Sequence, residues 1–117
     1  MPQLIEYNGE LLRIVPKGIE YSTNQGLTWH IRCYSNSIDG DFIDLLQFGN
    51  EFFAIMSKRG LFASSNSGKT WSQRAHSIPQ YGEFLTLSSD GSNLIATTSK
   101  AGLCVSRDAG RSWRRRQ

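Results

Sequence analysis

The sequence predicts an all-β fold made of three copies of one four-stranded antiparallel unit. Similar segments recur without gaps at a spacing of 42 residues. Short apolar and β-branched runs lie between bends rich in Gly, Asn, Asp and Ser, as strands lie between tight turns. No window of useful length shows the 3.6-residue period of an amphipathic helix. These three observations place the chain in an all-β repeat architecture.

The clearest repeat is a segment of twelve residues that ends in tryptophan. It occupies residues 18–29, 60–71 and 102–113. All three tryptophans of the chain and six of its eleven glycines fall in register in these copies. Chance does not produce such an alignment, so we expect each copy to fold in the same way.

Two strand-like runs precede each copy, and a short strand is expected after each tryptophan. The nearer runs are residues 11–15, 52–56 and 94–98, and the farther ones are residues 4–7, 42–46 and 84–87. Four antiparallel strands in 42 residues match one blade of a β-propeller. The chain is therefore interpreted as one repeat domain, with blades at about residues 1–38, 39–80 and 81–117.

The bend between the third and fourth strands reads Ser-x-Asn/Asp-x-Gly-x-Thr/Ser-Trp in all three copies. An Asn or Asp side chain can accept hydrogen bonds from the backbone N–H groups of a turn. Glycine can take the positive φ of a hairpin, and tryptophan can pack beneath it. The residues concerned are Ser22, Asn24, Gly26, Thr28, Trp29, Ser64, Asn66, Gly68, Thr70, Trp71, Ser106, Asp108, Gly110, Ser112 and Trp113.

This motif resembles the Asp-box, or BNR repeat, of sialidases, sortilin-type receptors, some glucanases and a photosystem assembly factor. Two of the three copies carry Asn where Asp is usual, and Asn can accept the same bonds. The resemblance extends over all three repeats and implies a β-propeller fold. It implies no single function, because the families that share the repeat do unrelated things.

Three blades are too few to close a ring, since propellers close with about four to eight. Each blade exposes an apolar face until the next blade covers it. A twofold dimer would place the third blade of each chain against the first blade of the other and make six blades. The sequence thus favours a six-bladed propeller completed by homodimerisation. A longer natural chain and a ring of another stoichiometry are the alternatives.

The first blade differs from its siblings at two positions that could lie in such a junction. Arg13 and Glu20 occupy places where the other blades have small or apolar residues, namely Ala54 and Ala96 for the first and Phe62 and Cys104 for the second. We expect the two charges either to specify the junction between chains or to point into the channel or solvent.

The most promising binding surface is the face where the links between blades emerge, opposite the Asp-boxes. The links carry Gly-acid-Phe twice, at residues 40–42 and 82–84, and basic turns end the second strands. The alternative is that these charges only form ion pairs between blades. The candidate residues are Lys17, Asp39, Asp41, Lys58, Arg59, Gln80, Tyr81, Glu83 and Lys100.

Enzyme activity is not expected. A sialidase would need three arginines converging on a carboxylate, a Tyr–Glu nucleophile pair and an acid Asp, and no such set can be assembled from the sequence. Paired carboxylates for another glycosidase cannot be identified either. His30 and His76 lack a metal-binding spacing, and Cys33 and Cys104 are expected to be buried free thiols. No metal or cofactor is predicted.

Composition leaves two classes of binding partner open. The net charge is +3, and five arginines lie in the last eleven residues. A protein, peptide or glycan could bind the link-bearing face, or an anion or nucleic acid the basic end, although that end could also be a solvated terminus. A self-assembling structural unit is a further alternative. No apolar run approaches the roughly 20 residues of a membrane helix, and no secretory signal is seen, so a cytoplasmic location is expected.

Overall fold

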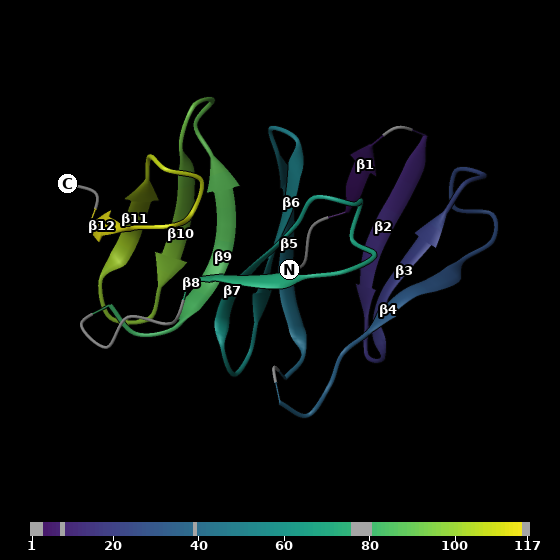
Figure 1. The fold of residues 1–117 in the computed structure, drawn as a ribbon, viewed down its shortest axis with the longest axis horizontal. Helices are drawn as coiled ribbons and strands as arrows, with labels where there is room; N and C mark the ends of the chain where they lie inside the picture. The colour runs from purple at the N-terminus through teal and green to yellow at the C-terminus, as the bar shows by residue number, and fades with distance from the viewer. Residues whose placement is uncertain (1–3, 8, 39, 76–80, 116–117) are drawn as a thin grey trace.

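A computed structural model describes residues 4–7, 9–38, 40–75 and 81–115 (Figure 1). It confirms the predicted all-β fold, because the strands form three four-stranded antiparallel sheets, each ordered as in the sequence. No described segment forms a helix long and apolar enough to cross a membrane. The strands are β1 (Ile5–Tyr7), β2 (Glu10–Val15), β3 (Gly18–Ser22), β4 (His30–Tyr34), β5 (Phe42–Phe48), β6 (Glu51–Met56), β7 (Gly60–Ser64), β8 (Ser72–Ala75), β9 (Phe84–Ser89), β10 (Leu94–Thr98), β11 (Gly102–Ser106) and β12 (Arg114–Arg115).

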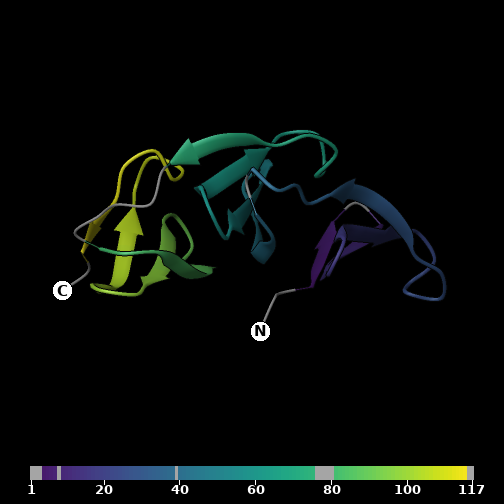
Figure 2. The ribbon, with the colours of Figure 1, turned by 90° about the horizontal axis from the view of Figure 1, so that it is seen from below.

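The three sheets, called blades 1 to 3, stand side by side along an arc (Figure 2). The first strand of each blade lies next to the first strand of the neighbouring blade, so β1, β5 and β9 form the inner edge of the arc. The fourth strands β4 and β8 run along its convex side. This arrangement is that of consecutive propeller blades around a channel.

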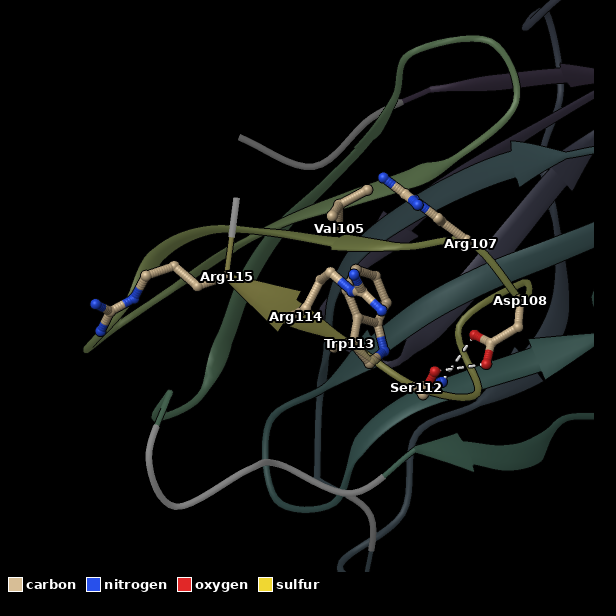
Figure 3. A pocket seen from close by; sticks show the side chains of 7 residues that line it. All are labelled: Val105, Arg107, Asp108, Ser112, Trp113, Arg114 and Arg115. Atoms are coloured by element: carbon tan, nitrogen blue, oxygen red, sulfur yellow. Dashed lines mark hydrogen bonds between the residues drawn. The ribbon is translucent and has the colours of Figure 1, made fainter. Parts of the chain in front are cut away.

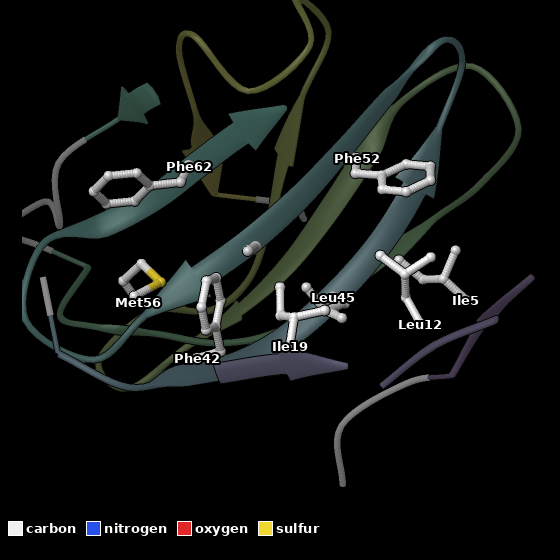
Figure 4. Packing of buried hydrophobic residues seen from close by; sticks show 9 residues of the cluster. Ile5, Leu12, Ile19, Phe42, Leu45, Phe52, Met56 and Phe62 are labelled. Carbon is white, nitrogen blue, oxygen red and sulfur yellow. The ribbon is translucent and has the colours of Figure 1, made fainter. Parts of the chain in front are cut away.

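The core lies between the blades rather than within any one of them. Ile5, Leu12 and Ile19 of blade 1 form a buried cluster with blade 2 residues that include Phe42 and Phe52 (Figure 4). Tyr7 adds an edge-to-face contact with Phe52 at 5.3 Å between ring centroids. Because successive strand residues point to opposite faces, each blade can supply both of its faces to such seams.

The seam between blades 2 and 3 repeats this packing one repeat later. Phe53, Ile55 and Leu61 from blade 2 are buried against Phe84 and Leu94 of blade 3. Alternate residues of β6 therefore serve opposite seams, which explains why all of Phe52–Met56 is buried.

An arginine on the outer strand ties each of the first two blades to the next Asp-box. Arg32 Nη1 donates to the Ser67 carbonyl at 3.0 Å, and its Nη2 lies 2.7 Å from Glu10 Oε2. Arg74 Nη1 donates to the Ala109 carbonyl at 2.7 Å and pairs with Glu51. The two arginine side chains are only 5% and 13% exposed, so their charges depend on these partners.

A buried carboxylate joins the inner strands. Asp44 Oδ1 accepts a hydrogen bond from the Leu45 N–H, and its Oδ2 accepts one from the Leu87 N–H of blade 3, each at 2.9 Å. The Asp44 residue is 3% exposed. It joins β5 to β9 at the inner edge of the arc, because a carboxylate of blade 2 accepts from a backbone N–H of blade 3.

Removing Arg74 should loosen the seam between blades 2 and 3. We expect Arg74→Ala to lower the free energy of unfolding by about 1–3 kcal/mol, because Glu51 loses its partner and the Ala109 carbonyl loses a donor. Urea unfolding measures the change. Arg115→Ala, at an exposed position, is the matched control and should have little effect. Equal losses in both variants would contradict this role.

The close approach of blades 2 and 3 should also make the protein sensitive to substitution of a glycine in the seam. A Cβ at Gly110 would lie 2.7 Å from Leu61 Cδ2 of the preceding blade, whereas a Cβ at Gly91 would meet nothing within 4 Å. Both glycines have φ near the left-handed region, at 90° and 100°. Gly91→Ala should therefore cost about 1 kcal/mol for the backbone alone, and Gly110→Ala at least about 2 kcal/mol. Thermal unfolding of the two variants provides the comparison.

Candidate binding site at the channel mouth

The Asp-box hairpins share one hydrogen-bond pattern. In blade 1, Asn24 Oδ1 accepts from the Thr28 N–H at 3.0 Å and from the Ser22 hydroxyl at 2.8 Å. Ser22 Oγ in turn accepts from the Gly26 N–H at 2.8 Å, and the Trp29 indole donates to the Gly26 carbonyl at 3.0 Å. The same bonds recur in blades 2 and 3. Asn and Asp therefore serve this turn equally as acceptors.

The hairpin needs two consecutive residues with positive φ. The glycine of the motif is one of them, with φ between 86° and 92° in the three copies. The residue before it is the other, and it is Gln25, Ser67 or Ala109, with φ of 62° to 64°. The sequence motif does not reveal this second position, because no glycine or asparagine marks it.

Asp108 differs from its two Asn counterparts in carrying charge. Its Oδ2 accepts from the Ser112 hydroxyl at 2.6 Å, and its Oδ1 accepts from the Ser112 N–H and the Ser106 hydroxyl. These bonds, above all those from Ser112, hold the pKa of the Asp108 carboxyl well below its ordinary value of 3.8.

The links between blades lie at the end of the sheets opposite the Asp-boxes. Figure 1 shows the β10–β11 turn at that end of blade 3, and backbone hydrogen bonds join this turn to Tyr81 and Glu83 of the link before β9. We call this end the link face; it comprises the β2–β3, β6–β7 and β10–β11 turns and residues 35–38, 40–41 and 81–83. The link glycines Gly40 and Gly82 fit under the turns, where a Cβ would lie 2.1 and 2.0 Å from the hydroxyls of Ser57 and Ser99. Backbone bonds from Ser57 and Ser99 to the link carbonyls complete the docking.

The charged side chains of the link face are exposed and little engaged. Among the described residues, Asp41 and Glu83 form no ion pair with Lys58 or Lys100. Lys58 Nζ instead donates to the Ser37 carbonyl at 3.1 Å. The inter-blade ion pairs that the sequence left open are thus not seen at these positions.

Other predicted members of this surface are placed around it. Lys17 and Arg59 lie in exposed turns, and Tyr81 is half-buried in the second link. Arg59 Nη2 donates to Gln73 Oε1 at 3.3 Å, on the outer side of blade 2. Asp39 and Gln80 lie outside the described residues.

Sequence reasoning missed an apolar pair at the channel mouth. The register of β5 with β6 shifts between Phe42 and Asp44, which makes Ile43 the extra residue of a β-bulge. Leu85 has the same place in β9, between Phe84 and Thr86. The two side chains are 38% and 42% exposed, on neighbouring inner strands. Their 42-residue spacing marks them as equivalent positions of the repeat. The alternation of apolar and polar residues along a strand does not reveal, however, that a bulge turns their side chains outward.

The described residues show little other chemistry. No group of three or more His, Cys, Asp or Glu side chains converges there as metal ligands would. The two cysteines are free thiols, as predicted, but only Cys104 is fully buried. Cys33 is half-buried on the outer strand β4, where burial raises the pKa of its thiol.

A hollow of about 680 Å³ lies at the outer edge of blade 3 (Figure 3). Three arginines from the basic end of the chain line it, namely Arg107, Arg114 and Arg115, together with one carboxylate, Asp108, and with Val105, Ser112 and Trp113. Among the described residues these three guanidinium groups have no carboxylate partner within ion-pair distance. The hollow is therefore a basic, partly apolar surface.

The low pKa of Asp108 has a measurable consequence. A carboxylate whose pKa is depressed on folding stabilises the fold fully above its ordinary value of 3.8 and loses that contribution as the pH falls below it. Asp108→Asn should therefore destabilise the protein at pH 7, and the difference from wild type should shrink toward about pH 2. Urea unfolding across this range tests it. Asn66→Asp is the converse control and should add acid sensitivity; parallel pH profiles would contradict the assignment.

Comparisons with known proteins agree with this geometry. A family model described as BNR/Asp-box repeat matches residues 20–30, which contain the first hairpin. A search of curated proteins found no match.

Two solved structures share the fold. YCF48 from Cyanidioschyzon merolae is 21% identical, with a TM-score of 0.68 over 91% of this chain and 32% of its own. A structure described as YCF48 bound to D1 peptide is 17% identical, with a TM-score of 0.67 over 97% of this chain and 46% of its own. The chain thus spans about a third to a half of the length of these β-propellers. Residues 20–30 thus match the BNR/Asp-box repeat, and the three sheets have the fold of consecutive β-propeller blades.

Proposed function

We propose that this chain is a non-catalytic binding module that holds a peptide segment of a partner protein at the channel mouth of the link face. The observation that carries the proposal is the exposed apolar pair Ile43 and Leu85, which two β-bulges turn outward. Bulges are common where a strand must re-aim a side chain at a binding site. Ile43 and Leu85 offer an anchor for an apolar side chain of a ligand.

Charged groups surround this apolar pair. Asp41 precedes Ile43 by two residues, Glu83 precedes Leu85 by two, and the turn lysines Lys58 and Lys100 dock against the same links. All four side chains are exposed. A peptide has both N–H donors and carbonyl acceptors. A rim that carries both positive and negative side chains therefore suits a peptide better than a rim of one charge.

More apolar surface lies on the same face. Tyr34, at the end of β4, is 66% exposed, and Ile38, in the first link, is 70% exposed. Large apolar side chains gathered at one end of a molecule are typical of interaction surfaces. A ligand of several residues could therefore continue from the mouth across blade 1.

One similar structure supports the class of ligand. A YCF48 structure of the same fold is described as bound to a D1 peptide, and its TM-score with this chain is 0.67. The low identity of 17% leaves the sequence of the ligand open. A peptide is nevertheless favoured over a glycan, because the mouth offers an aliphatic anchor, which suits an apolar side chain better than a sugar ring.

The test is a selection from a random twelve-residue peptide library displayed on phage, with the D1 peptide as an additional defined probe. Selected peptides, labelled with fluorescein, would be titrated by fluorescence polarisation. We expect Ile43→Ser with Leu85→Ser to weaken binding at least about tenfold, the loss expected when a buried apolar anchor is removed. Ile31→Ser, at a 36% exposed position on β4, is the matched control.

The outcome is decisive in either direction. Binding that survives the double substitution would contradict the proposed mouth, and so would a library that yields no peptide. Affinity that falls steeply with salt and depends on Arg107 and Arg114 would point instead to an anionic ligand at the basic end.

A further inference from the structure

The two end blades each leave one face uncovered. Ile19 and Leu61 occupy equivalent places in blades 1 and 2, and both are fully buried by the following blade. Their counterpart in blade 3, Leu103, is 47% exposed. At the other end, Leu4 is 60% exposed, although its counterpart Leu45 is fully buried. Each end thus carries one half of a seam of the kind that holds the blades together.

We name these two surfaces by their place in the chain. The leading face is the open face of blade 1 and comprises Leu4, Glu6, Leu11, Arg13, Glu20 and Trp29. The trailing face is the open face of blade 3 and comprises Ser88, Thr97, Leu103, Val105, Arg107 and Arg114. Register supports both sets, because Glu6 lies opposite Leu11, Arg13 opposite Glu20, and Val105 opposite Arg114.

The leading face carries a much larger side chain than the other blades at one position. Arg13 stands where they have Ala54 and Ala96. Its guanidinium stacks 3.9 Å above the Trp29 ring and lies 2.8 Å from Glu20 Oε1. The two charges were expected either to specify the junction or to point into the channel or solvent; they form an ion pair on the open face of blade 1.

The trailing face is correspondingly smaller. Thr97 stands where the other blades carry Ile14 and Ile55, and Ser88 stands where they carry Ile5 and Leu46. The larger residues all belong to the buried or partly buried clusters of the internal seams. The smaller Thr97 and Ser88 leave room on the trailing face for a larger side chain, such as Arg13, on a face that covers it.

The charges of the two faces are also complementary. The trailing face has Arg107 and Arg114 where blade 2 has Ser65 and Ser72. Both arginines line the basic hollow shown in Figure 3. The leading face has Glu6 and Glu20 where blade 2 has Gln47 and Phe62, and with Arg13 beside Glu20 its net charge is still negative, opposite to that of the trailing face.

At one position of the Asp-box hairpin, blades 2 and 3 have a basic residue and blade 1 does not. Lys69 of blade 2 lies in the seam with blade 1, beside Glu10 and Arg32, and blade 3 has Arg111 at the same place. Blade 1 has Leu27 instead, which is 84% exposed. A lysine there would meet the arginines of a trailing face, so leucine avoids a like-charge contact.

We propose that the trailing face of one copy binds the leading face of a second copy, and that two such seams close a six-bladed ring. Three blades from each of two chains give six, within the range of about four to eight that closes a propeller. The seam would continue the interface already present twice in the chain. A second copy is the favoured occupant, because the departures of each face are matched by departures on the other face of the same chain.

Light scattering on a sizing column measures the first expectation, a mass of twice 13.2 kDa. Arg107→Glu with Arg114→Glu should give a monomer, because acidic groups then face Glu6 and Glu20. Glu6→Lys with Glu20→Lys should give a monomer for the converse reason. Mixing the two variants should restore the dimer, because both seams of the mixed pair again join opposite charges.

The mixing experiment distinguishes loss of the interface from loss of the fold, since an unfolded variant would not form a dimer when mixed. Lys17→Glu with Lys100→Glu changes the net charge equally at exposed turns outside the two faces and should leave the mass unchanged. The proposal would be overturned if the wild-type protein were a monomer or a larger polymer. It would also be overturned if either charge-reversed variant alone were a dimer, or if the mixture of the two stayed monomeric.

Discussion

The structure depends on the burial of each blade by its neighbour. A single four-stranded sheet cannot cover its own two faces, so its apolar side chains must meet another sheet. In this chain Leu12, Phe53 and their neighbours are buried only because the next blade covers them. The same requirement explains the arginines Arg32 and Arg74, which bring a donor to the Asp-box carbonyls of the following blade. The Asp-box is thus part of the seam as well as a local turn.

Much of this could be predicted from the sequence, because the repeat carries redundant information. Three copies in register indicated the strands, the blades and the hairpins, and the hydrogen bonds of Ser22, Asn24 and Trp29 follow from the motif. A feature that recurs three times can be separated from chance without an alignment of relatives.

The features that could not be predicted depend on register and on contacts between distant residues. The bulges at Ile43 and Leu85 invert the face that simple alternation would assign to them, and no residue type in β5 or β9 marks a bulge. The Arg74 clamp joins residues 35 positions apart, so its partner is visible only once the blades are side by side. The positive φ of Gln25, Ser67 and Ala109 follows from the geometry of the turn rather than from their side chains.

Similarity between the blades and departure from it carry different information. Positions that repeat, such as Trp29, Trp71 and Trp113, build a fold that many unrelated functions can use. The link-face anchor is a repeated feature that faces solvent, which packing within the chain does not require. Arg13 and Leu27 are departures, and a departure on a face that every other blade buries needs a partner to explain it. Functional residues of a short repeat protein are therefore best sought at two kinds of position. One is a repeated apolar residue that faces solvent without a packing role, and the other is a position at which one repeat differs from the others.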